Sequence, residues 1–222
     1  MIIQRRQALA AIGMFALGGC NALQFVTNRQ TPRLFQLTPK TTFDESLPVV
    51  KGAVVIDPPS AIAGLNTARM ALRPDPTLLE YYANALWVDV VPIMVQNLMQ
   101  ESLDATERID ALSPVEASGI RAEFSLRMHI REFQAEYDEG TLKPPLVNVR
   151  IEARLLQLPR RDSLETVSFQ QFERSKETNV ESIVRAYDDA LGKVLRHLVE
   201  WTITRIARAN EGATGDTDGN PD

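Results

Sequence analysis

The sequence predicts an α+β fold, a two-layer sandwich of a mostly antiparallel sheet with two main amphipathic helices. Apolar and polar residues alternate over 122–130 and again over 147–155, as they do in half-buried strands. In two other segments, 89–106 and 183–201, apolar residues recur at helical spacing. A sheet that is apolar on one face needs helices on that face only. We therefore expect two layers, one formed by the sheet and one by the helices.

The alternating segments predict an antiparallel meander of three strands. In the first strand, 122–130, the apolar parity then shifts, so we expect a β-bulge near Arg131 and Glu132. A turn over 138–144 leads to the second strand, 147–155. A further turn leads to the third strand, 167–172, and short connections of this kind favour antiparallel pairing.

Four weaker strand signals precede the meander. The segment 51–57 is stopped by two prolines, and 33–37 reads as a short edge strand stopped by Pro39. The segments 69–73 and 78–82 flank a proline-containing turn.

Two helices complete the predicted domain, which we place at 33–208. The first runs from Asp89 to Thr106, with Asp89 as its N-cap and a proline tolerated in its first turn. The second begins after Thr178 and Glu181, which have the spacing of a capping box. The last segment, 209–222, holds four acidic residues and no basic one, so we expect an acidic disordered tail.

The amino terminus has the order of an export signal. Residues 1–19 carry two arginines, then an apolar run too short to span a bilayer, then small residues before the chain's single cysteine, Cys20. Leu17-Gly-Gly-Cys20 resembles the bacterial lipobox, whose cysteine is acylated and becomes the first residue. A signal peptide with an incidental cysteine and an uncleaved anchor are the alternatives. Export by the general or the twin-arginine route is left open.

An acylated Cys20 would anchor the chain to a membrane, because several acyl chains together hold a protein stably. Residues 20–32 then form the lipidated cysteine and a short polar tether. By resemblance to other bacterial lipoproteins, Asn21 favours the outer membrane, with the domain facing the periplasm.

Composition excludes several kinds of chemistry. One cysteine cannot form an intramolecular disulfide or a cysteine-based zinc site, and a net charge of -5 without a basic cluster argues against a nucleic-acid partner. We predict that His129 lies on a solvated strand face and that His197 packs on the last helix. No nucleophile elbow, phosphate loop or metal-ligand spacing occurs. We therefore expect no catalytic residues, no metal and no cofactor.

The aromatic group Tyr81, Tyr82 and Trp87 is the candidate partner-binding site. It lies between a proline-rich turn and the first predicted helix. Aromatic residues in such a place either pack in the core beneath the helix or form an exposed contact surface.

The chain resembles the ABC-type transport auxiliary lipoprotein family, whose best-known members are the PqiC-like lipoproteins. The resemblance covers roughly residues 30–205, and 64–72 and 81–87 are its most specific parts. Six segments carry it in order: Phe35–Pro39, Val54–Pro59, Gly64–Leu72, Glu80–Trp87, Leu126–Tyr137 and Ala186–Gly192.

The resemblance implies a lipoprotein that works with an MCE-domain protein, a permease and an ATPase to move lipids between the inner and outer membranes. It implies an α/β sandwich and no active site, with ATP hydrolysis in another subunit. Two other hypotheses stay open: a carrier lipoprotein that binds phospholipid directly, and an outer-membrane assembly lipoprotein or pilotin.

Overall fold

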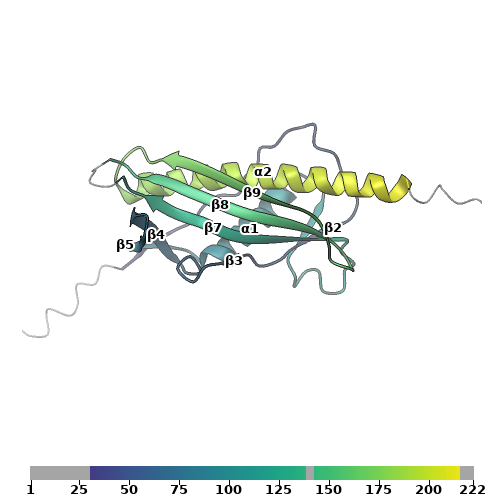
Figure 1. Cartoon of the computed structure of the whole chain (residues 1–222), viewed down its shortest axis with the longest axis horizontal. Helices are drawn as coiled ribbons and strands as arrows, with labels where there is room; N and C mark the ends of the chain where they lie inside the picture. Colours follow the sequence, from purple (N-terminus) through teal and green to yellow (C-terminus); the bar gives the residue numbers. More distant parts are fainter. Residues whose placement is uncertain (1–30, 139–142, 216–222) are drawn as a thin grey trace, which may run out of the picture. The chain divides into compact units, whose positions relative to one another are not determined.

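The structure is a computed structural model that describes residues 31–138 and 143–215, and the described residues from Arg33 onwards belong to one compact unit. In this part of the chain, nine strands form one mixed sheet and two helices form a second layer. In Figure 1 the long strands β7, β8 and β9 lie in front of helix α2. The predicted α+β sandwich is confirmed.

The centre of the sheet is the predicted antiparallel meander. β7 (Phe124–Glu136) pairs with β8 (Leu146–Gln157), which pairs with β9 (Asp162–Arg174). The register shifts between Ile130 and Glu132, which confirms the predicted bulge. β9 is longer than predicted at both ends, because its polar outer positions continue to pair with β8 where the apolar signal stops.

Three short strands pair with the edge of β7 opposite β8, and all three run parallel to β7. They are β2 (Ala53–Ile56), β3 (Ser60–Ala61) and β4 (Arg69–Asp75), each paired with a successive part of β7. β6 (Asp110–Leu112) lies on the far side of β2, also parallel. The three longest ladders are nevertheless antiparallel, so the sheet is mostly antiparallel as predicted.

A hairpin of β4 and β5 (Leu78–Trp87) lies at one end of the sheet, with β2 at the other end (Figure 1). β1 (Arg33–Phe35) pairs in parallel with the end of β5. β5 continues beyond the predicted boundary at Tyr82 because register shifts against β4 absorb extra residues, among them Asn84 with a φ of 57°.

The first helix is α1 (Val91–Asp104), and its N-cap is Val90 rather than the predicted Asp89. Val90 is extended, and no side chain caps the helix; the Asp89 carboxylate instead accepts a hydrogen bond from the Val90 N–H at 2.7 Å. The proline in the first turn is confirmed.

The second helix, α2 (Val180–Gly215), is longer than predicted at its end. Asn179 Oδ1 accepts from the Ser182 N–H at 2.8 Å, so the cap lies one residue after the predicted Thr178. We predicted disorder from residue 209, whereas the helix continues to Gly215. Asn210 in this last part donates to the Lys51 carbonyl at 3.1 Å, which ties the helix to the loop before β2. Residues 216–222 lie outside the described residues.

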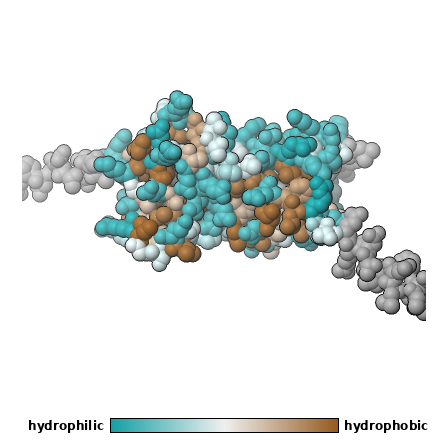
Figure 2. Space-filling view, turned by 180° about the vertical axis from the view of Figure 1, so that it is seen from behind, coloured by the Kyte–Doolittle hydropathy of each residue, from teal (hydrophilic) through white to brown (hydrophobic). Residues whose placement is uncertain are grey.

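One hydrophobic core lies between the sheet and the helices. It takes the inward side chains of β7 and β8 and the apolar faces of α1 and α2. Figure 2 shows the surface seen from behind the view of Figure 1, where apolar residues gather in separate groups among hydrophilic ones. Neither helix in the described part of the chain combines the length and apolarity that a membrane span requires.

Candidate functional site

Trp87 is a core residue. Its side chain is only 1% exposed and meets Phe133 and Tyr187 edge to face, with ring centroids 5.9 and 5.1 Å apart. Such pairs add to the apolar area that the ring buries. For Trp87 the structure therefore shows core packing, here against β7 and α2, and its ring is not part of an exposed contact surface.

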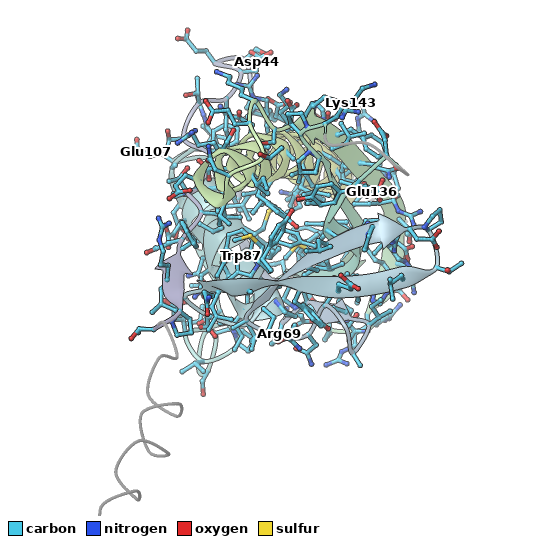
Figure 3. All side chains as sticks on the ribbon, turned by 90° about the vertical axis from the view of Figure 1, so that its left-hand side faces the viewer. Asp44, Arg69, Trp87, Glu107, Glu136 and Lys143 are labelled. Atoms are coloured by element: carbon cyan, nitrogen blue, oxygen red, sulfur yellow. The ribbon has the colours of Figure 1, made fainter. Side chains whose placement is uncertain are left out.

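Tyr81 lies on the other side of the hairpin. Its hydroxyl donates to the Gly64 carbonyl at 3.0 Å, and the Arg69 guanidinium lies over its ring, 3.7 Å from the centroid. Figure 3 shows Arg69 and Trp87 on opposite sides of the two hairpin strands. The loop approaches the strand closely here, because a Cβ at Gly64 would lie 2.5 Å from Leu79 Cδ2 and the Leu79 side chain would have to move.

Apolar residues continue this side of the hairpin across the strands. Leu34 of β1 is in register with Leu86 of β5, and Leu86 is in register with Arg69 of β4, so the three side chains share one face. Val88 follows directly and donates its N–H to the Phe35 carbonyl at 2.9 Å. Leu34 and Val88 are 64% and 48% exposed.

We call these residues the hairpin surface: Leu34, Arg69, Tyr81, Leu86 and Val88. It combines an arginine and a tyrosine, which are residue types enriched in interface hot spots, with exposed aliphatic side chains. The sequence identified only Tyr81 of this set, because the others reach it through strand pairing.

Tyr82 is half-buried and couples two strands. Its hydroxyl shares a hydrogen bond with the Tyr137 hydroxyl at 2.8 Å, which joins β5 to the end of β7. Burial, and secondly this hydrogen bond, raise the pKa of Tyr82 well above that of a free tyrosine. Tyr82 follows Tyr81 directly in β5, so its side chain lies on the opposite face of the strand and does not belong to the hairpin surface.

A polar network that the sequence analysis did not identify crosses the outer face of the sheet. Glu132 lies between Arg150, at 2.9 Å, and Arg73, at 3.4 Å. The buried Gln134 amide donates to Glu132 at 2.7 Å and to Glu136 at 2.9 Å. Arg73 belongs to β4, so the network also joins the hairpin to β7. Alternating polar residues were visible in the sequence, but their partners depend on register.

The remaining candidates are placed as follows. His129 lies on the outer face of the sheet, where its Nδ1 is 2.7 Å from the Ser60 hydroxyl. His197 packs beside Phe169, with ring centroids 5.5 Å apart. Within residues 31–138 and 143–215, no group of three or more His, Cys, Asp or Glu side chains is arranged to hold a metal ion. Cys20 lies outside the described residues.

Comparison with known proteins identifies the family. The sequence model of the ABC-type transport auxiliary lipoprotein component matches residues 35–199, which include both strands of the hairpin and the meander. The chain belongs to this family. The family is described as an auxiliary lipoprotein component of ABC-type transport, which fits a location in the cell envelope.

Similar proteins support the fold. A crystal structure of protein XCC0632 from Xanthomonas campestris has a TM-score of 0.75 at 22% identity, over 81% of this chain and 99% of that one. An uncharacterized protein of known structure has a TM-score of 0.55 at 14% identity, with the same coverage. An uncharacterized protein from Bradyrhizobium diazoefficiens is 25% identical over 203 residues, 89% of this chain. The chain spans about half the length of that relative.

Proposed function

We propose that this chain is a non-catalytic docking lipoprotein of an MCE-type ABC transporter that moves lipids between the inner and outer membranes. An acylated Cys20 fixes it to the outer membrane, and the folded domain faces the periplasm. The hairpin surface binds the MCE-domain protein. Energy for transport comes from ATP hydrolysis in another subunit.

The hairpin surface is the observation that carries this proposal. The two segments whose resemblance to the family is most specific, 64–72 and 81–87, come together here through the Tyr81 contacts with Gly64 and Arg69. Apolar side chains stay exposed beside them, and burial of such side chains is the main driving force for protein association. Family membership supplies the class of partner.

The anchor supports a docking role by its position in the chain. Twelve residues separate Cys20 from Arg33, the first residue of β1. Even fully extended, they reach only about 40 Å. An acylated Cys20 therefore keeps the hairpin surface close to the membrane and raises its local concentration there without adding contacts.

Direct carriage of a phospholipid is the second hypothesis, and the described surface favours it less. A hollow of about 560 Å³ beside α1 is lined by Lys51, Asp104, Glu107, Arg108 and Asp110 together with a few apolar residues. Lipid chains require apolar walls, and charged walls are costly to desolvate beside them. Docking is therefore the better account of the exposed apolar residues on the hairpin.

Site-specific photo-crosslinking in cells tests the docking proposal. A photoreactive phenylalanine analogue at Leu34 or Val88 should give an adduct with the MCE-domain protein. Val115 is the matched control, because it is an aliphatic residue that is 84% exposed and belongs to a different part of the chain. Equal adducts from position 115, or no transporter component among the adducts from 34 and 88, would contradict the proposal.

The crosslinked adducts also test the pilotin hypothesis, and a second experiment tests the carrier hypothesis. An adduct with an outer-membrane channel subunit, in place of a transporter component, would favour the pilotin role. Solvent extraction of the purified chain tests carriage: phospholipid at about one molecule per chain would favour a carrier, and a lipid-free extract would favour docking alone.

A further inference from the structure

Two arginines face each other on the outer face of the sheet, away from the hairpin surface. Arg127 of β7 and Arg154 of β8 are directly opposite in the antiparallel ladder. Side chains in such positions lie within a few ångströms of each other at their base, and like charges there destabilise the sheet. Nearby negative charge would offset this repulsion between Arg127 and Arg154.

The described residues compensate the positive charge only in part. Asp57 accepts from Arg127 Nε at 3.1 Å, and Glu152 accepts from Arg131 Nη2 at 3.0 Å. Arg154 donates its Nε to the neutral Thr166 hydroxyl at 3.1 Å. Of the described carboxylates, none is paired with Arg154, so three arginines meet two carboxylates and one positive charge is left over.

A hollow of about 150 Å³ opens between these residues. Arg127, Glu152 and Arg154 line it, together with Ser60 and His129, which lie side by side where β3 pairs with β7. The Ser60 hydroxyl and His129 Nδ1 are 2.7 Å apart. Guanidinium, hydroxyl and imidazole groups from three strands therefore line the hollow. The carboxylate of Glu152, which also lines it, is already paired with Arg131.

We infer that this hollow binds a phosphate group, held by Arg154 and Arg127 with the Ser60 hydroxyl and the His129 ring as further polar contacts. Guanidinium groups bind phosphate with two parallel, charge-assisted hydrogen bonds. A bound phosphate would supply the negative charge that the Arg127 and Arg154 pair lacks. The phosphate belongs either to a lipid headgroup or to a free ion, and the inference does not depend on the proposed transporter role.

Thermal unfolding of the full chain in dodecyl maltoside tests the inference. Inorganic phosphate and glycerophosphoglycerol, the headgroup of phosphatidylglycerol without its acyl chains, are titrated at constant ionic strength. Arg154→Gln removes the uncompensated charge. Arg121→Gln is the control, because it removes the same charge from an exposed loop residue that does not line the hollow.

Phosphate should raise the unfolding temperature of the wild type and of Arg121→Gln in a saturable way. Its affinity should fall about tenfold or more in Arg154→Gln, since a charged hydrogen-bonded pair is lost. Ser60→Ala should weaken binding less, because both arginines remain. Without phosphate, Arg154→Gln should unfold at a higher temperature than the wild type, because the opposed charges are relieved.

The two ligands distinguish the source of the phosphate. Tighter binding of glycerophosphoglycerol identifies a lipid headgroup, and tighter binding of inorganic phosphate identifies the free ion. The inference is overturned if neither ligand stabilises the chain more than chloride does, or if both variants lose the response equally. It is also overturned if Arg154→Gln is less stable than the wild type without ligand, because Arg154 would then be a structural residue.

Discussion

Replacing Trp87 by alanine should destabilise the fold strongly, because the ring is buried between Phe133 and Tyr187. Removing a buried tryptophan in this way costs about 3–5 kcal/mol. In a domain of this size each kcal/mol lowers the unfolding temperature by about 2–4 °C. Trp87→Ala should therefore unfold about 6–20 °C below the wild type.

Tyr81→Ala is the matched comparison, because Tyr81 lies in the same strand and faces the other way. It loses a neutral hydrogen bond to Gly64 and the stacking of Arg69, together about 1–2 kcal/mol. Its unfolding temperature should fall by only about 2–8 °C. Recovery of the transporter partner, however, should fall sharply, because Tyr81 belongs to the hairpin surface.

The assay combines circular dichroism melting of the purified full chain with partner crosslinking in cells grown at a temperature where both variants stay folded. Crosslinking from position 34 keeps the reporter the same in both variants. If Trp87→Ala melts within about 2 °C of the wild type and yet loses the partner, Trp87 is a surface contact and the core assignment is refuted.

Three further predictions concern groups away from the partner surface. Burial raises the folded-state pKa of Tyr82 and Tyr187 above the unfolded value near 10. As the pH rises, these tyrosines lose their protons in the unfolded chain before they do so in the folded chain, so the free energy of unfolding falls above about pH 10. Each tyrosine contributes about 1.4 kcal/mol per pH unit, and Tyr187→Phe should remove one contribution from the slope of alkaline unfolding measured by denaturant titration. Burial, and secondly neighbouring acids, raise the pKa of Asp104, so its ionised form destabilises the folded chain. Asp104→Asn should therefore raise the unfolding temperature at pH 7, and this gain should vanish toward pH 3, where the carboxyl is protonated. A lower unfolding temperature at pH 7 would contradict this. Gly64→Ala should cost about 1 kcal/mol through contact with Leu79, and a Leu79→Ala background should abolish that cost in a double-mutant cycle.

Local patterns predicted the long elements well. The bulge near Glu132 followed from a shift in apolar parity, and both helices followed from their apolar stripes. The pattern could not reveal β3, since two residues show no alternation, nor the direction of β2 and β4 beside β7, since alternation is the same in parallel and antiparallel strands.

The candidate site could be predicted from the sequence only in part. Tyr81 was identified as an aromatic residue in an unusual place, but its neighbour Leu34 joins it through pairing between distant strands. Trp87 could not be separated from Tyr81 by sequence because the irregular pairing within β5 decides which residues face inward. The opposition of Arg127 and Arg154 likewise depends on the register of two strands.

Cys20→Ser is the change that tests the central claim most directly, because one measurement follows anchoring and docking together. Cells are fractionated, and each fraction is examined for the chain and for crosslinks to the MCE-domain protein. We expect the wild type in the outer membrane with its partner, and the variant outside that fraction with partner recovery greatly reduced. If Cys20→Ser fractionates like the wild type and recovers the same partner, the chain is not a lipid-anchored docking protein.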